Sequence, residues 1–192
     1  MEALKRNEYY NYSDYLNWET EQRYELIDGV PYLMSPAPSW THQNISIELS
    51  RQFANFLLDK ACKVFTAPFD VRLNADENDD TVVQPDLVIV CDRSKLVKTG
   101  YMGVPKMVIE ILSPSTARHD KLLKFNKYLE AGVSEYWIVD PESKTLSVYL
   151  LKSGEYFSRV YSETDVVPVT ALEGCAINMQ SVFSDIPQEP VQ

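Results

Sequence analysis

Three short apolar runs dominate the middle of the chain, at residues 82–90, 107–112 and 136–139. They are rich in valine and isoleucine, and runs of this length and composition are typical of buried strands. A lysine-rich segment with apolar residues at helical spacing, residues 118–131, separates the second run from the third. A strand–helix–strand order packs the helix against a sheet, so the sequence predicts an α/β fold with a mixed central sheet flanked by helices.

Two of these runs each carry one acidic residue. Asp86 stands at the head of the first run, after Pro85, and Glu110 lies between Ile109 and Ile111 in the second. A charge on a buried strand is costly unless a cation or a metal compensates it. Neighbouring strands are about 4.8 Å apart, so the two carboxylates could share one divalent cation, and oxygen ligands suit Mg²⁺ or Mn²⁺ better than zinc. The plainer alternatives are a turn residue for Asp86 and a solvent-facing edge residue for Glu110.

The helix at residues 118–131 supplies a candidate cationic group. Ser115 or Thr116 is expected to cap it and Gly132 to end it. Lys124 lies two turns past the cap, where it could return over the strand ends and orient an attacking water or stabilise a phosphate. The alternative is a solvated helix face. The spacing predicts a buried face and an opposite basic face: Leu122, Phe125 and Leu129 buried, and Arg118, Lys121, Lys124 and Lys127 away from it.

The N-terminal part predicts a hairpin and a long helix. Ser13 and Asp14 are expected to cap a short helix that runs to Trp18. Residues 24–34 indicate a β-hairpin around the turn pair Asp28-Gly29, with Pro31 favouring an edge position for its second arm. Residues 41–58 predict an amphipathic helix on a sheet, with four apolar residues at helical spacing: Ile45, Leu49, Phe53 and Phe56.

Further elements complete the expected sheet. Residues 64–73 predict one strand, and residues 74–80 an acidic, solvated loop that lacks the glycine and distal glutamate of an EF-hand calcium site. Residues 146–161 predict a second hairpin around Ser153-Gly154. We expect one domain of residues 15–184, with an N-terminal extension at 1–14 and a C-terminal tail at 185–192.

Charge and cysteine usage narrow the function classes. The formal net charge of −10 argues against nucleic-acid binding over the whole surface, but allows a local basic patch or a nuclease that neutralises phosphate with metal ions. The three cysteines, Cys62, Cys91 and Cys175, form no CxxC pair, so neither a disulfide nor a zinc ribbon is expected and a reducing cytoplasm is the natural setting. No apolar stretch is long enough for a membrane span or a signal peptide.

The motifs together resemble a known family. They are YELIDG at 24–29, His42 opening a helix, QPD at 84–86, VIEILSPST at 108–116, Asp120 with Lys124 and Tyr128, and GVSEYWIVDP at 132–141. In this combination the chain resembles the putative restriction endonuclease family, a branch of the PD-(D/E)XK nuclease superfamily that long carried the label of a domain of unknown function. The resemblance spans residues 15–183. It implies a restriction endonuclease-like fold.

The resemblance also implies roles for individual residues. Asp86 matches the aspartate of the PD motif and Glu110 the acidic residue of (D/E)XK, both implied metal ligands. Glu25 matches an upstream acidic position that could complete the metal site. The usual lysine position of the (D/E)XK motif, two residues after the glutamate, is Leu112 here. In this branch the lysine looks to have moved onto the following helix, and Lys124 fits that place. His42 matches a recurrent histidine, for which a structural or capping role is expected.

The expected function is therefore a metal-dependent DNA endonuclease that hydrolyses phosphodiester bonds with Mg²⁺ or Mn²⁺. Asp86, Glu110 and Lys124 are the expected catalytic residues, and Glu25 and the Ile111 carbonyl would complete the metal ligands. A homodimer follows by analogy, because cutting both strands needs two sites. The alternative is a catalytically inactive module that keeps the fold; its Lys124 would point away from both acids. A third possibility is a hydrolase of small phosphates with a closed pocket.

Overall fold

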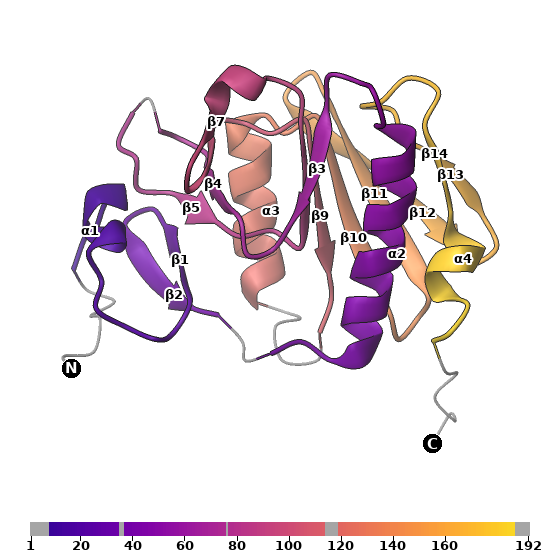
Figure 1. The fold of residues 1–192 in the computed structure, drawn as a ribbon, viewed down its shortest axis with the longest axis horizontal. Coiled ribbons are helices and arrows are strands. Elements are labelled where there is room, and N and C mark those ends of the chain that lie inside the picture. The colour runs from indigo at the N-terminus through magenta and orange to yellow at the C-terminus, as the bar shows by residue number, and fades with distance from the viewer. Residues whose placement is uncertain (1–7, 35–36, 76, 114–118, 187–192) are drawn as a thin grey trace.

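The computed structural model describes residues 8–34, 37–75, 77–113 and 119–186. These residues form two six-stranded sheets, a short two-stranded sheet and four α-helices (Figure 1). The expected capping residues Ser115 and Thr116, the helix start at Arg118 and the end of the C-terminal tail lie outside the described residues. None of the described helices has the length and hydrophobicity that a membrane span requires.

The larger arrangement is a mixed sheet with strand order β12-β11-β10-β9-β6-β3. Within this sheet, as far as the described residues show, only β9 and β10 pair in parallel, because the helix α3 between them carries the chain back across the sheet. The strands are β3 (Lys63–Thr66), β6 (Leu87–Val90), β9 (Met107–Ile111), β10 (Glu135–Asp140), β11 (Thr145–Lys152) and β12 (Glu155–Ser162). The α/β fold with a mixed central sheet is thereby confirmed.

The second sheet has strand order β2-β1-β5-β4-β8-β7. The expected hairpin is its first pair, β1 (Tyr24–Ile27) and β2 (Val30–Leu33), and β2 with Pro31 forms the sheet edge as expected. Asp28 and Gly29 both have positive φ, which two-residue hairpin turns of the primed type require. The other strands are β4 (Asp70–Arg72), β5 (Val82–Val83), β7 (Leu96–Val97) and β8 (Gly100–Met102).

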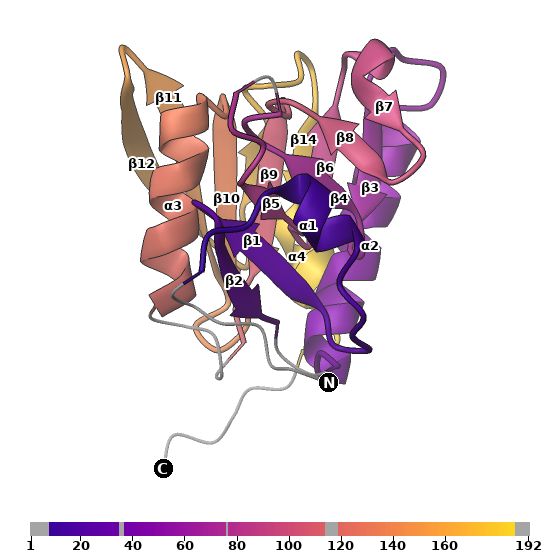
Figure 2. The same ribbon diagram turned by 90° about the vertical axis from the view of Figure 1, so that its left-hand side faces the viewer.

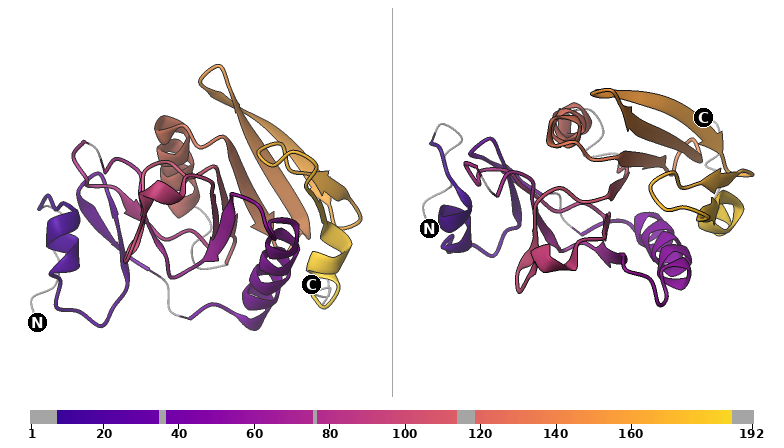
Figure 3. Two further views of the ribbon diagram at one scale, coloured as in Figure 1. Left: turned by 45° about the horizontal axis from the view of Figure 1, so that its top comes forward. Right: turned by 90° about the horizontal axis from the view of Figure 1, so that it is seen from above.

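Two helices cover opposite faces of the mixed sheet (Figures 1 and 3). On one face, α2 (Trp40–Phe56) packs Ile45, Leu49 and Phe53 against Leu87 and Ile109. The small elements α4 (Met179–Phe183), β13 (Val166–Pro168) and β14 (Ala176–Asn178) extend this core. On the other face, α3 (His119–Ala131) packs against the alternate strand residues, among them Val88 and Val108. Successive side chains of a strand point to opposite faces of the sheet, so the same strands contribute residues to both hydrophobic cores.

Three sequence predictions about local structure were wrong. Residues 64–73 do not form one strand: β3 and β4 belong to different sheets, with Pro68 between them. Proline cannot donate to a ladder, so the chain leaves one sheet there. The short helix α1 (Tyr12–Leu16) begins one turn earlier than expected, because Asn11 is its cap and Asp14 completes a capping box.

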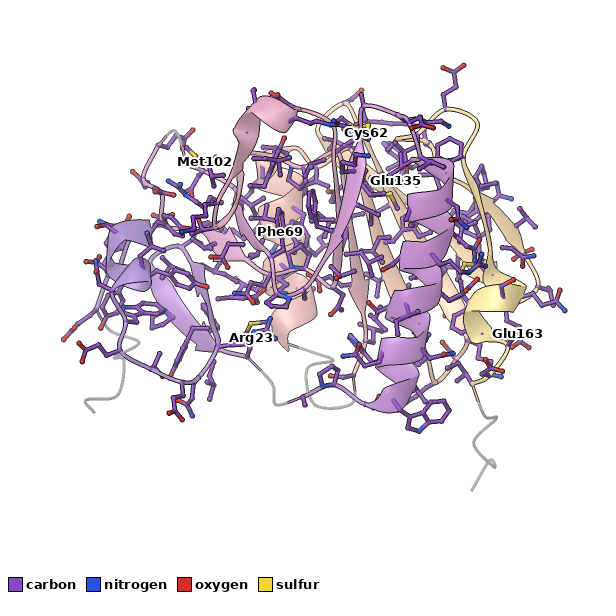
Figure 4. The ribbon with its side chains drawn as sticks, in the orientation of Figure 1. Arg23, Cys62, Phe69, Met102, Glu135 and Glu163 are labelled. Carbon is purple, nitrogen blue, oxygen red and sulfur yellow. A yellow bond between two sulfur atoms is a disulfide. The ribbon has the colours of Figure 1, made fainter. Side chains whose placement is uncertain are left out.

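The third correction concerns the cysteines. Cys62 and Cys91 form a disulfide, against the expectation of none (Figure 4). The cause is the strand register: Lys63 pairs with Val90 across β3 and β6, so the next residues outward, Cys62 and Cys91, lie opposite each other. Their separation of 29 residues along the chain conceals this proximity. Cys175 is free and buried.

Candidate active site

The segment Gln84-Pro85-Asp86 carries the chain from one six-stranded sheet to the other. It follows β5 of the second sheet and precedes β6 of the mixed sheet. The backbone N–H of Gln84 donates to Glu25 Oε1 of β1 at 2.7 Å. Asp86 Oδ2 accepts from the Ile111 N–H at the end of β9, also at 2.7 Å. This crossing therefore holds acidic residues of both sheets in one place.

Lys124 of α3 joins the acids of the two sheets. Its Nζ lies 2.7 Å from Glu25 Oε1 and 3.1 Å from Glu110 Oε1. Lys124 therefore does not lie on a solvated face, and the predicted helix orientation was wrong. Leu122, expected to be buried, is 70% exposed, while Tyr128 is fully buried. The cost of leaving the buried carboxylates without a cation is greater than the gain from burying Leu122, so α3 turns the face with Lys124 toward the sheet.

Tyr128 is a site residue to which the sequence reasoning assigned no role. Its hydroxyl donates to Glu110 Oε1 at 2.7 Å. It lies one helical turn after Lys124, so both side chains reach the same carboxylate from one face of α3. The spacing of Lys124 and Tyr128 was the available signal, since residues four apart on a helix point the same way.

His42 contacts the remaining acid. Its Nε2 lies 3.2 Å from Asp86 Oδ1. The backbone N–H of His42 donates to Ser39 Oγ, the N-cap of α2. The side-chain contact with Asp86 is one that the sequence did not suggest, and the structural or capping role expected for His42 stays a prediction. Among the described residues, His42 Nδ1 is buried without a hydrogen-bond partner.

A polar network supports Glu25 from outside. The Gln84 side chain accepts from Arg23 and donates to Asp70 Oδ1 at 2.8 Å and to the Tyr15 hydroxyl at 3.0 Å. Arg23, labelled in Figure 4, lies at the edge of this network and is exposed. The network fixes the segment that carries both the Gln84 N–H and Asp86.

The electrostatics of the site follow from its surplus of acids. Burial is the main cause that raises the pKa of Glu110, with nearby Asp86 and Glu25 acting in the same direction; Lys124 and the Tyr128 hydroxyl act against them, and the pKa is about 7. Burial acts to lower the pKa of Lys124, but Glu110 and Glu25 outweigh it and raise that pKa above its ordinary value. For His42, burial is likewise outweighed, chiefly by Asp86, and its pKa is raised. The carboxylates thus favour the charged forms of both cationic side chains.

The donor chemistry of the site fits a hard divalent cation. Glu25, Asp86 and Glu110 offer carboxylate oxygens, and the Ile111 carbonyl lies close enough to act on His42. Within the described ranges, no three His, Cys, Asp or Glu side chains are already arranged around a common metal position. Lys124 instead contacts Oε1 of Glu25 and Oε1 of Glu110. The Oε2 atoms of these two glutamates take part in neither contact.

The structure therefore brings four expected site residues into one connected group. Lys124 contacts both Glu25 and Glu110, and Asp86 joins them through the N–H of Ile111, the residue after Glu110. Leu112, at the usual lysine position of the (D/E)XK motif, leaves that position without a cation, and Lys124 reaches Glu110 from the helix instead. The roles of these residues in catalysis or metal binding stay predictions.

A solved structure shares this fold. It is the crystal structure of a putative nuclease belonging to DUF820 from Anabaena variabilis, with a TM-score of 0.73 and 21% sequence identity. The superposition covers 91% of this chain and 97% of the Anabaena chain. At this identity the likeness establishes the fold alone.

Sequence comparison identifies relatives and the family. The Synechocystis proteins slr1290 and sll1609 are 31% and 28% identical to this chain, over 139 and 133 residues. The alignments cover 71% of this chain and 71% of slr1290, and 67% of this chain and 73% of sll1609. The family model described as "Putative restriction endonuclease", Uma2, matches residues 12–180. With most of its length matched by that model, the chain belongs to the Uma2 putative restriction endonuclease family.

Proposed function

We propose that this protein is a metal-dependent endonuclease that hydrolyses phosphodiester bonds of DNA at a PD-(D/E)XK-type site. The observation that carries the proposal is the position of Lys124 Nζ, within 3.1 Å of both Glu25 Oε1 and Glu110 Oε1. A lysine beside two acids is the arrangement that this chemistry needs; here the acids come from strands of two different sheets and the lysine comes from a helix. Family membership supports the same reaction class.

Glu25, Asp86, Glu110 and the Ile111 carbonyl would hold Mg²⁺ or Mn²⁺. The cation would supply Lewis acidity toward a phosphate oxygen and acidify a water molecule. It would also offset phosphate charge for a protein whose formal net charge is −10.

The chain's own residues would position the reactants. Lys124, fixed by two carboxylates, would donate to the attacking water or to a non-bridging phosphate oxygen, where negative charge grows in the transition state. Tyr128 would hold Glu110 in place through its hydroxyl. His42 would hold Asp86 from the other side.

The test is a plasmid-cleavage assay with Mg²⁺ or Mn²⁺ on the full chain. Glu110→Gln keeps the shape of the side chain and removes its charge, and Lys124→Ala removes the ammonium. We expect both variants to lose cutting. Lys127→Ala is the matched control: Lys127 is on the same helix but bonds Asp28 and Glu130, so its loss should leave cutting intact.

Cutting that survives both Glu110→Gln and Lys124→Ala would overturn the assignment of the site. If no variant cuts, Mn²⁺ titration calorimetry decides. Binding that Glu110→Gln abolishes would support the metal site. A wild type that binds no metal would instead favour an inactive module with a nuclease-like fold. The inactive-module hypothesis predicts that Lys124 points away from Glu110, whereas in the structure the two residues are in contact.

A further inference from the structure

The edges of the two six-stranded sheets are not equally protected. The edge strand β2 carries Pro31, and β7 is only two residues long. The four-residue edge strand β3 is packed by α2. Proline, short length and a covering helix are the usual means by which proteins prevent edge-to-edge pairing. The fourth edge, β12, has none of them.

Strand β12 is long, regular and outward-facing. All eight of its residues pair with β11 without a bulge, and among the described residues no strand pairs with its other side. Figure 2 places it at the outer margin of the molecule. Phe157 is 54% and Val160 63% exposed. An exposed, apolar, unpaired edge of this length is a template for another strand.

The turn that precedes β12 determines which backbone groups are free. Ser153 and Gly154 both have positive φ and form a two-residue turn closed by the pair Lys152 and Glu155. In such hairpins the closing pair is hydrogen-bonded, so bonding to β11 alternates from Glu155 onward. The N–H and C=O groups of Tyr156, Ser158 and Val160 therefore point outward, away from β11.

We propose that β12 pairs with β12 of a second copy of this chain, antiparallel about a two-fold axis at Ser158. Such an axis keeps each side chain on its own face of the joined sheet and makes the contact self-complementary. Tyr156 then lies opposite the partner's Val160, and Phe157 opposite the partner's Arg159. Aromatic residues favour β-branched and cationic neighbours. Both exposed apolar side chains become covered.

Charge selects this register over its neighbours. Glu155 and Arg159 are the two charged residues of β12. An axis at Ser158 brings Glu155 diagonally next to the partner's Arg159, whereas an axis at Arg159 sets two like charges face to face. An axis at Phe157 shortens the overlap and leaves Val160 opposite the turn. The inferred interface does not depend on the proposed nuclease activity.

The first test is the mass of the full chain by sedimentation equilibrium. We expect a dimer of twice 22.0 kDa that Val160→Lys weakens about tenfold or more in Kd. Ile47→Lys is the matched control, because Ile47 is equally exposed, at 65%, but lies on α2. A wild type that stays monomeric up to about 0.1 mM, or a dimer disrupted by Ile47→Lys but not by Val160→Lys, would overturn the proposal.

A charge reversal tests the partner contact directly. Glu155→Arg and Arg159→Glu should each weaken the dimer, because each leaves the strand with a single sign of charge. The double variant restores one charge of each sign and should recover the wild-type mass. Failure of the double variant to recover, while it remains folded by circular dichroism, would contradict the complementarity of these two residues.

Cross-linking tests the register. Residues opposite each other in a hydrogen-bonded antiparallel pair have Cα atoms about 5.5 Å apart, within the range of a disulfide. Ser158→Cys is therefore expected to give a disulfide-linked dimer on mild oxidation. Ser162→Cys, at the far end of the strand from the axis, is expected to give none. The reverse result would overturn the register.

Discussion

Glu110 and Glu135 are glutamates on neighbouring parallel strands, three positions apart in register: Met107 pairs with Glu135 and Glu110 with Ile138. Glu135 is fully buried and accepts from the Trp137 indole N–H at 2.7 Å and the Ala171 N–H at 2.6 Å (Figure 4). Glu110 has Lys124 and Tyr128 as donors, both on Oε1, and two further carboxylates nearby.

The difference teaches what a buried acid indicates. Burial raises the pKa of both glutamates. Around Glu135, neutral N–H groups donate to both carboxylate oxygens. These hydrogen bonds connect the segment before β14 to the sheet and leave neither oxygen without a partner. Around Glu110, three acids face one lysine and one histidine, and the surplus negative charge suits an added cation. Burial alone does not mark a functional site; the balance of its partners does.

The largest expected effect comes from Lys124→Ala. Removing one member of a buried ion pair leaves uncompensated charge, so the metal-free variant should lose about 3–5 kcal/mol of unfolding free energy. Mn²⁺ should restore part of the loss, because a ligand that binds only the folded state stabilises it. Urea denaturation with and without Mn²⁺ measures both. An Mn²⁺ effect equal to that on Lys127→Ala would contradict the inference that the acids around Glu110 suit an added cation.

Glu135→Ala should cost about 2–4 kcal/mol, from the lost packing and from the indole and backbone N–H groups left unpaired. The same denaturation experiment should show no greater recovery with Mn²⁺ than for the wild type. Calorimetry should find unchanged Mn²⁺ affinity. A loss of metal binding in this variant would place Glu135 in the same functional unit as Glu110.

The pH dependence of stability reports on the environment of Glu110. Its folded pKa of about 7 lies above the ordinary 4.5, so the folded state holds this proton more tightly than the unfolded state. The contribution of Glu110 is then fully present below about pH 4.5 and falls as pH rises toward 7, by about 3 kcal/mol. In metal-free protein, Glu110→Gln should remove this decline. An identical pH profile for both proteins would contradict the assigned environment.

The smallest effect is expected for Tyr128→Phe. The change removes one hydrogen bond to Glu110 and preserves the packing of the ring, so it should cost about 1 kcal/mol. If Tyr128 positions Glu110, cleavage should fall through kcat more than through KM. Phe125→Leu, on the same helix but in the apolar cluster, is the control, and it should leave the ratio of the two constants unchanged.

Local patterns predicted the regular elements well. The turn pairs Asp28-Gly29 and Ser153-Gly154 both adopt the positive φ values that hairpins need. The stripe of Ile45, Leu49 and Phe53 is fully buried. These features depend on neighbours in the sequence, so the sequence contains the information directly.

Features that depend on distant partners were harder to predict. Periodicity assigned Lys124 to solvent because its partners, Glu25 and Glu110, lie on strands far away in the chain. Its position two turns past the helix cap, together with the family resemblance, pointed to Lys124, whereas the apolar periodicity did not. The Cys62–Cys91 disulfide required the register between β3 and β6, which no local pattern contains. The contacts of His42 and Tyr128 likewise needed the folded arrangement.

The segment Gln84-Pro85-Asp86 passes between two sheets, and Lys124 touches one acid from each of them. The contacts of Lys124 with both acids therefore require that the two sheets stay in their present relative position. Thermodynamic linkage makes this reciprocal: whatever binds at the site strengthens the junction of the sheets, and whatever loosens the junction weakens binding by the same free energy. Substitutions at Arg23 or Tyr15, outside the site, should thus change ligand affinity through the junction alone.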